Sequence, residues 1–244
     1  MAVRRIQAMI LDGTFAAGER LPAERRLAER LAISRASLRE ALSTLETLGV
    51  VRSEPHRGTF VATDMAGETS PQPAWRFASR YALPEVYQFR LLTESYAARL
   101  ATMAITDVDV QALQNIVRDF KEATRVLDLV AAAQADFDLH HRVMQLSGNR
   151  ILADLHGTYA EVLQESQLMP VARHERVWET VDEHEKLMQA ISRRDPDGAE
   201  YYMRLHITRA ADRAGIALSD TPPRFAALPA LTRSAPGRTT ESAA

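Results

Sequence analysis

The sequence has no cysteine among its 244 residues. Disulfide bonds, thiol catalysis and thiolate metal sites are therefore excluded, and a reducing compartment is permitted. Long apolar runs are also missing. No stretch reaches the roughly 18 residues that a membrane-spanning helix needs, and the apolar run near the N-terminus is too short for a signal peptide. We therefore expect a cytoplasmic protein that has no membrane partner.

Lysine is absent from the first 63 residues, although this segment carries ten arginines. With seven acidic residues, its net charge is +3, whereas the remaining chain has 20 basic and 25 acidic residues and a net charge of −5. Hydrophobic residues make up 46% of the chain, which is ordinary for a globular protein and enough for one large or two small cores. A basic head on an acidic body indicates an anionic partner for the head.

The head, residues 1–63, is predicted to contain three helices and a hairpin. Apolar spacing favours a helix over 2–12, and Pro22 suits the first turn of a second helix that ends near Leu31. Ser34 is a good N-cap for a third helix, which Gly49 terminates. Two short strands, VVRS and TFVA, follow and are separated by EPHRG.

The rest of the chain reads as a linker, a helical body and a tail. Residues 64–82 are polar and contain two prolines, so they form the predicted linker. Residues 83–216 show helical patterns and no convincing strand, and residues 217–244 are rich in Pro, Ser, Thr and Ala and are predicted to be a disordered tail. Body helices are expected over 84–103, 128–147, 150–167, 173–193 and 196–214, and Thr106 is the expected N-cap of a further helix between the first two.

A helix, a short turn and a capped helix with arginine and serine in its first turn are typical of a helix-turn-helix, whose second helix enters the major groove. Arginine can hold guanine through two hydrogen bonds. The candidate DNA-binding residues are Arg25, Ser34, Arg35, Ser37, Arg39, His56 and Arg57. The alternative is a small helical domain whose arginines are simply solvated.

In the body, the segment DFDLHH contains two overlapping acid–imidazole pairs. Asp136 and His140 are four residues apart on a mostly apolar helix face, whereas Asp138 and His141 fall on a more polar side. His184 and His206 lie in later helices. One carboxylate and three imidazoles suit a divalent ion such as Zn, Ni or Mn. Each residue could equally be hydrogen-bonded by itself, because spacing alone does not show that they converge.

The head resembles the winged helix-turn-helix of the GntR family of bacterial transcription regulators. The resemblance covers roughly residues 2–62 and lies in ERLPAERRLAERLAISRASLREALSTLETLGVVRSEPHRGTFV. It implies DNA contacts by Arg25, Arg35 and Arg39, with a wing tip at His56 to Gly58. Two residues depart from the family pattern: Ala23 stands in place of a capping serine, and Ala32 replaces glycine in the turn.

The body resembles the FadR C-terminal (FCD) sensor domain over about residues 83–215. The matching motifs are Arg90 with Glu94, Asp136 with His140 ahead of SGN at 147–149, Glu183 with His184, and His206. The resemblance implies that Asp136, His140, His184 and His206 bind a divalent metal inside a helical bundle. It also implies that Arg90 binds a small carboxylate effector, although an ion pair with Glu94 would equally explain this arginine. Asn149 is a further effector candidate on composition.

These observations together predict a mainly α protein, with an N-terminal winged helix-turn-helix and a C-terminal antiparallel helical bundle. The expected function is that of a metal-containing repressor that binds a palindromic operator as a homodimer and responds to a small organic or sugar acid. Two alternatives stay open. The metal itself could be the signal, or the site could belong to a metal-dependent hydrolase with Glu183 as general base.

Overall fold

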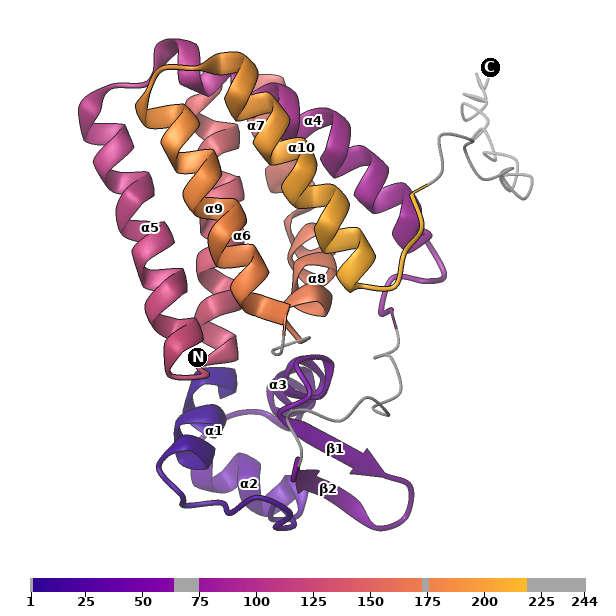
Figure 1. The fold of residues 1–244 in the computed structure, drawn as a ribbon. Helices are drawn as coiled ribbons and strands as arrows, with labels where there is room; N and C mark the ends of the chain where they lie inside the picture. The colour runs from indigo at the N-terminus through magenta and orange to yellow at the C-terminus, as the bar shows by residue number, and fades with distance from the viewer. Residues whose placement is uncertain (1, 64–74, 173–175, 219–244) are drawn as a thin grey trace, which may run out of the picture.

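The computed structural model describes residues 2–63, 75–172 and 176–218, which form a small head and a larger helical body (Figure 1). Most of the predicted linker and almost all of the predicted tail lie outside these residues. Within the described ranges, no helix combines the length and hydropathy that a membrane span requires.

The head is a helix-turn-helix followed by a two-stranded wing. Its elements are α1 (Ala2–Leu11), α2 (Glu24–Leu31), α3 (Arg35–Thr47), β1 (Val51–Glu54) and β2 (Gly58–Val61). The strands are antiparallel, with Val51 opposite Val61 and Glu54 opposite Gly58. The hydroxyl of Ser34 accepts a hydrogen bond from the Ser37 backbone N–H, so the predicted cap of α3 is confirmed.

The two alanines that depart from the family pattern lie at the two ends of α2. Ala23 precedes α2 without forming a side-chain cap, and Ala32 has a left-handed φ of 50°. A residue with a Cβ in this conformation costs roughly 1–2 kcal/mol. The packing of Leu27, Leu38 and Leu45, all 0% exposed, holds the turn in place.

The body is built from helices that pack side by side (Figure 1). Helix α10 packs against α4 and α9, and α5 packs against α6 and α9. Side-chain caps at Thr106, Asp128, Asn149 and Asp195 mark where four of the helices begin. The body helices are α4 (Leu83–Ala104), α5 (Asp107–Arg125), α6 (Leu129–Leu146), α7 (Arg150–Thr158), α8 (Ala160–Val171), α9 (Val177–Ser192) and α10 (Pro196–Arg213).

The single helix expected over 150–167 is two helices, α7 and α8. Tyr159 separates them, with φ −101° and ψ 15°. Gly157, two residues earlier, lowers helix stability by roughly 1 kcal/mol relative to alanine. The predicted helix over 173–193 corresponds to α9, and its first residues, 173–175, lie outside the described part of the chain.

Residues 75–82, the described end of the predicted linker, pack against the body. The indole N–H of Trp75 donates to the carbonyl of Tyr81 at 2.6 Å. Trp75 and Tyr81 belong to an aromatic cluster with Phe89 and Tyr159, in which the rings of Tyr81 and Tyr159 meet edge to face. This end of the segment is therefore fixed to α4 and to the α7–α8 junction.

The head and body share one hydrophobic cluster, in which head residues such as Ile6 and Leu45 join body residues such as Phe120 and Leu168. A polar contact crosses the same boundary. The amide oxygen of Gln7, on α1, accepts the Val130 N–H at 3.1 Å, and its NH₂ group approaches the Leu127 carbonyl at 3.4 Å. Gln7 is 2% exposed. The head thus caps the first turn of α6, whose N–H groups have no partner within the helix.

Candidate metal centre

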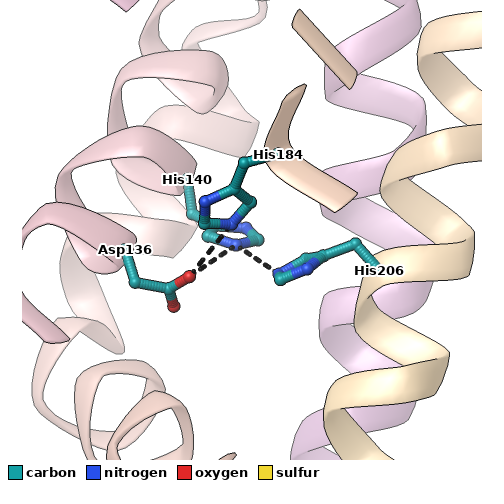
Figure 2. A group of neighbouring side chains, drawn as sticks. All are labelled: Asp136, His140, His184 and His206. Atoms are coloured by element: carbon teal, nitrogen blue, oxygen red, sulfur yellow. Dashed lines mark hydrogen bonds and ion pairs between the residues drawn. The ribbon is translucent and has the colours of Figure 1, made fainter. Parts of the chain in front are cut away.

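Four residues from three helices meet inside the body: Asp136, His140, His184 and His206 (Figure 2). Each offers one ligand atom, and these atoms all lie within 4.8 Å of one another. Asp136 and His140 are one helical turn apart on α6, while His184 comes from α9 and His206 from α10. All four are buried. The structure therefore supplies the convergence that spacing alone left open.

Two carboxylates behind the imidazoles determine which ring nitrogens face the centre. Oε2 of Glu94 lies 2.5 Å from Nδ1 of His140, and Oε2 of Glu183 lies 3.0 Å from Nδ1 of His206. Both carboxyls have a pKa of about 2: burial opposes their ionisation, but neighbouring arginine and histidine outweigh it. An ionised carboxylate only accepts hydrogen bonds, so Nδ1 of His206 donates to Glu183 and its Nε2 presents a lone pair, whereas the close contact between His140 and Glu94 lacks hydrogen-bond geometry.

The two Nε2 atoms of His140 and His206 lie 3.1 Å apart. Burial lowers the pKa of His206 to about 4, with His184 and His140 adding to the effect and Glu183 opposing it, so this ring is neutral at pH 7. The Nε2 lone pair of His206 therefore faces Nε2 of His140 at hydrogen-bonding distance. A divalent cation at this position would be coordinated by imidazole nitrogens.

Asp136 and His184 complete the cluster, but they do not form a hydrogen bond with each other. Oδ1 of Asp136 lies 3.1 Å from Nε2 of His184. Among the described residues, neither that oxygen nor either ring nitrogen of His184 forms a hydrogen bond of acceptable geometry. The pKa of Asp136 is lowered, because the neighbouring histidines outweigh burial. A buried ionised oxygen and a buried imidazole nitrogen, both without hydrogen bonds, fit a metal-binding role.

Glu183, which the sequence suggested as a general base, has a structural task instead. Its carboxylate accepts hydrogen bonds from both terminal nitrogens of Arg213, at 2.9 and 2.8 Å, as well as contacting His206. The Arg213 side chain is 0% exposed. Glu183 therefore orients the His206 ring and neutralises a buried arginine. The role of Arg213 was not predicted from the sequence, because its partner Glu183 lies on another helix, 30 positions away.

Arg90 lies on α4, fully buried, beside Glu94. Its Nε donates to Oε1 of Glu94 at 3.1 Å, and one terminal nitrogen lies 3.5 Å from the Ser166 hydroxyl. The other, Nη2, has no hydrogen-bond partner among the described residues. The ion pair with Glu94 considered in the sequence analysis is therefore present. It leaves one donor of the guanidinium free for a further acceptor.

The remaining polar residues of this region lie elsewhere. The Asn149 amide oxygen accepts hydrogen bonds from the N–H groups of Ile151 and Leu152, so it caps α7 at the surface and does not join the cluster. Asp138 is exposed, as expected. His141 is half-buried rather than solvated, because its ring stacks on Phe137 with centroids 5.8 Å apart.

The candidate DNA-binding residues gather on α2, α3 and the wing, away from the cluster (Figure 1). Their side chains are exposed, apart from the half-buried Gly58. Arg39 forms an ion pair with Glu24 at 2.8 Å, and Arg57 pairs with Glu54 at the wing tip. His56 has φ 62° and Gly58 φ 109°, the positive values that a tight turn needs. The set consists of Arg25, Ser34, Arg35, Ser37, Arg39, His56, Arg57 and Gly58.

Two family descriptions match the two parts of the chain. Residues 1–61 match the gntR family of bacterial regulatory proteins, and residues 85–209 match the FCD domain. The chain belongs to the GntR family of bacterial transcription regulators. The predicted winged helix-turn-helix and helical sensor domain are thereby confirmed, and the hydrolase alternative is wrong, because the family and the relatives are transcription regulators.

Relatives align over most of the chain. An uncharacterized HTH-type transcriptional regulator of Bacillus subtilis, YcbG, is 31% identical over 216 residues, covering 86% of this chain and 87% of that protein. A putative L-lactate dehydrogenase operon regulatory protein of Escherichia coli is 30% identical over 218 residues, covering 84% and 81%. A solved GntR regulator from Rhodococcus sp. RHA1 has a TM-score of 0.50 at 19% identity, covers 87% of this chain and 95% of that one, and supports the fold alone.

The family establishes a general role for this GntR regulator. It is a small-molecule-responsive transcription regulator, of a family whose members bind DNA and an effector and are typically dimeric. FCD domains often bind a metal, and the Asp/His₃ cluster is a group that could hold one.

Proposed function

We propose that this GntR regulator holds a divalent metal ion at Asp136, His140, His184 and His206, and that a small organic or sugar acid binds beside the ion. Zn, Ni and Mn are the ions that best match one carboxylate and three imidazoles. The observation that carries the proposal is the convergence of four buried ligand atoms within 4.8 Å of one another. Of these residues, Oδ1 of Asp136 and both ring nitrogens of His184 have no hydrogen-bond partner among the described residues. A bound ion supplies positive charge, which attracts the carboxylate of the effector.

Arg90 is the protein's own contribution to effector binding. Its Nη2 is a buried donor without a partner, and it belongs to a guanidinium that Glu94 already orients. Tyr87 supports the same arginine: its ring lies 5.2 Å from the guanidinium carbon, and its hydroxyl donates to the Ser166 carbonyl. The free donor and the metal would together bind one carboxylate.

The head would bind a palindromic operator in the cytoplasm as part of a homodimer. Arg35, Arg39 and Ser37 on α3 would read the major groove, Arg25 would hold phosphate, and the wing tip at His56 to Gly58 would contact the adjacent backbone. An exposed apolar stripe on α4 supports the dimer: Leu92 is 68%, Tyr96 49% and Met103 69% exposed, all on one helix face.

Communication between the two parts would pass through α6. This helix carries Asp136 and His140, and its first turn is capped by Gln7 of the head. A cleft of about 610 Å³ lies between α3 and the body, lined by Ser37, Glu40, Gln134 and Glu165 among others. Effector binding that shifts α6 would change how the head sits, and the operator affinity of the dimer with it. We expect the effector to relieve repression.

The test is an operator-binding assay on protein whose metal content has been measured by elemental analysis. We expect about one ion per chain, a dimer by light scattering, and weaker operator binding when an organic acid is added to metal-loaded protein. His184→Ala should lower metal affinity at least about 100-fold, because even indirect support of a ligand is worth 10- to 100-fold. Unchanged metal content in His140→Ala and His184→Ala would refute the metal assignment. A response to metal without any acid would make the ion the signal.

A further inference from the structure

A chain of hydrogen bonds leads from the surface towards the metal centre along α6 and α7. Nη1 of Arg142 lies 3.3 Å from Oε1 of Gln145, and this donor fixes the orientation of the Gln145 amide. The amide NH₂ therefore points the other way, to Nε2 of His141 at 2.8 Å. Because that nitrogen accepts a hydrogen bond from the Gln145 amide, Nδ1 is the His141 nitrogen that carries a proton.

The next member of the chain is His156. Nδ1 of His141 lies 3.2 Å from Nδ1 of His156, so the protonated nitrogen of one ring faces the nitrogen of the other. His156 must accept there, and its own proton is then on Nε2. Nε2 is buried, in a residue that is 0% exposed, and forms no hydrogen bond with any described residue. The chain of hydrogen bonds therefore ends at the Nε2–H group of His156, which has no acceptor among the described residues.

His156 lies close to the groups around the metal centre. Burial lowers its pKa to about 4, and the charges of Glu94, His140 and Arg90 also act on it, so the ring is neutral at pH 7. Its centroid lies 5.5 Å from that of Phe137, on the helix that carries two of the metal ligands. Nη2 of Arg90 on α4 and Nε2 of His156 on α7 are both buried and without a hydrogen-bond partner among the described residues, and the charge of Arg90 acts on the His156 ring. Leaving such a donor unpaired is unfavourable, and a ligand oxygen that accepts from it would remove this cost.

We propose that His156 is a specificity-determining residue for the effector, and that its Nε2–H donates to a hydroxyl or keto oxygen of an organic acid whose carboxylate is bound at Arg90. This inference rests on the proposed function and narrows it. Of the organic acids, the ones preferred would be those that carry a second oxygen acceptor near the carboxylate, and simple aliphatic acids would bind less well.

The test compares acids that differ by one hydroxyl group, using calorimetry on the zinc-loaded full chain. The pairs are L-lactate with propionate and L-malate with succinate. We expect the wild type to prefer the hydroxylated member of each pair by about tenfold, which corresponds to one hydrogen bond in a buried site. His156→Phe, which keeps an aromatic ring and removes the donor, should abolish this preference. His156→Gln, which can place an amide N–H near the same position, should restore part of it.

Zinc content and melting temperature of each variant serve as further readouts, because a purely structural role would change those and leave the preference intact. If His156→Phe keeps the tenfold preference, or if the wild type binds all four acids equally, the role of His156 is overturned while the proposed function stands. If zinc-loaded wild-type protein binds none of the four acids, both are overturned. Loss of the preference in His156→Phe together with its return in His156→Gln supports the inference.

Discussion

The head and the body both contain arginine–carboxylate pairs, but they place them in opposite surroundings. In the head, Arg39 and Glu24 pair with side chains that are 67% and 43% exposed. In the body, Arg213 and Glu183 pair with side chains that are 0% and 1% exposed. Exposed pairs contribute little and leave the arginine free to change partners, whereas a buried pair cannot lose one member without a large cost. The same residue types therefore give adaptable surface charge in the head and a fixed arrangement of side chains around His206 in the body.

The largest effect should come from breaking a buried pair. Glu183→Gln leaves the Arg213 charge buried without a full counter-charge, so we expect the free energy of unfolding to fall by about 3 kcal/mol. The change also removes the charge behind His206, so metal affinity should fall about 10- to 100-fold. Urea denaturation and a chelator competition assay would measure the two effects.

Glu185→Gln is the matched control on the same helix. Glu185 is 43% exposed, and its partner Lys121 lies at the surface at 2.7 Å. We expect its unfolding free energy and metal affinity to stay near wild type. Equal losses in the two variants would contradict the contrast between the buried and the exposed pairs.

A smaller effect, confined to DNA binding, is expected for the exposed arginines of the head. Arg35→Ala should weaken operator binding by about 1–3 kcal/mol if this side chain contacts a base edge, and should leave melting temperature and metal content unchanged. Fluorescence anisotropy with an operator fragment at several salt concentrations would measure it. Arg118→Ala, an exposed arginine of α5, should bind as the wild type does. A loss of the same size at Arg118 would mean that general charge, rather than the α3 surface, controls binding.

The smallest loss of stability is expected for a substitution at the boundary between the head and the body. Gln7→Ala removes one buried hydrogen bond to Val130, which is worth about 1 kcal/mol of stability. If α6 carries the signal, the variant should bind operator but respond less to effector, as measured by the ratio of operator affinities with and without acid. The control is Gln111→Ala, whose amide donates to Asn115 at the surface of α5. A Gln7→Ala protein with the full response would show that the signal takes another route.

Local features of the fold were predictable because they depend on neighbours in the sequence. Ser34 and Thr106 cap the helices that their side-chain chemistry predicts, and the four-residue spacing of Asp136 and His140 sets them on one face. The break at Tyr159 was not predicted, because the apolar pattern continues through it. Tertiary packing, rather than helix periodicity, decides where α7 ends and α8 begins.

The candidate site was predictable only in part. Spacing placed Asp136 with His140, but His184 and His206 come from other helices, and only the family resemblance implied that they converge. The carboxylates behind the ligands depend on three-dimensional contacts: Glu94 was seen as a partner of Arg90, and its 2.5 Å contact with His140 could not be read from the sequence. His156 was missed for the same reason, since its partner His141 lies 15 positions away.

Gln7 gives the two parts a thermodynamic relation beyond their connection along the chain. Its amide completes hydrogen bonds at the first turn of α6 that the body cannot complete by itself. The head is therefore a tethered ligand of the body, present at the high effective concentration that a covalent linker provides. Docking of the head stabilises the N-terminal turn of α6 by mass action. The coupling is reciprocal: a change that frays this turn weakens docking of the head by the free energy with which docking stabilises the turn.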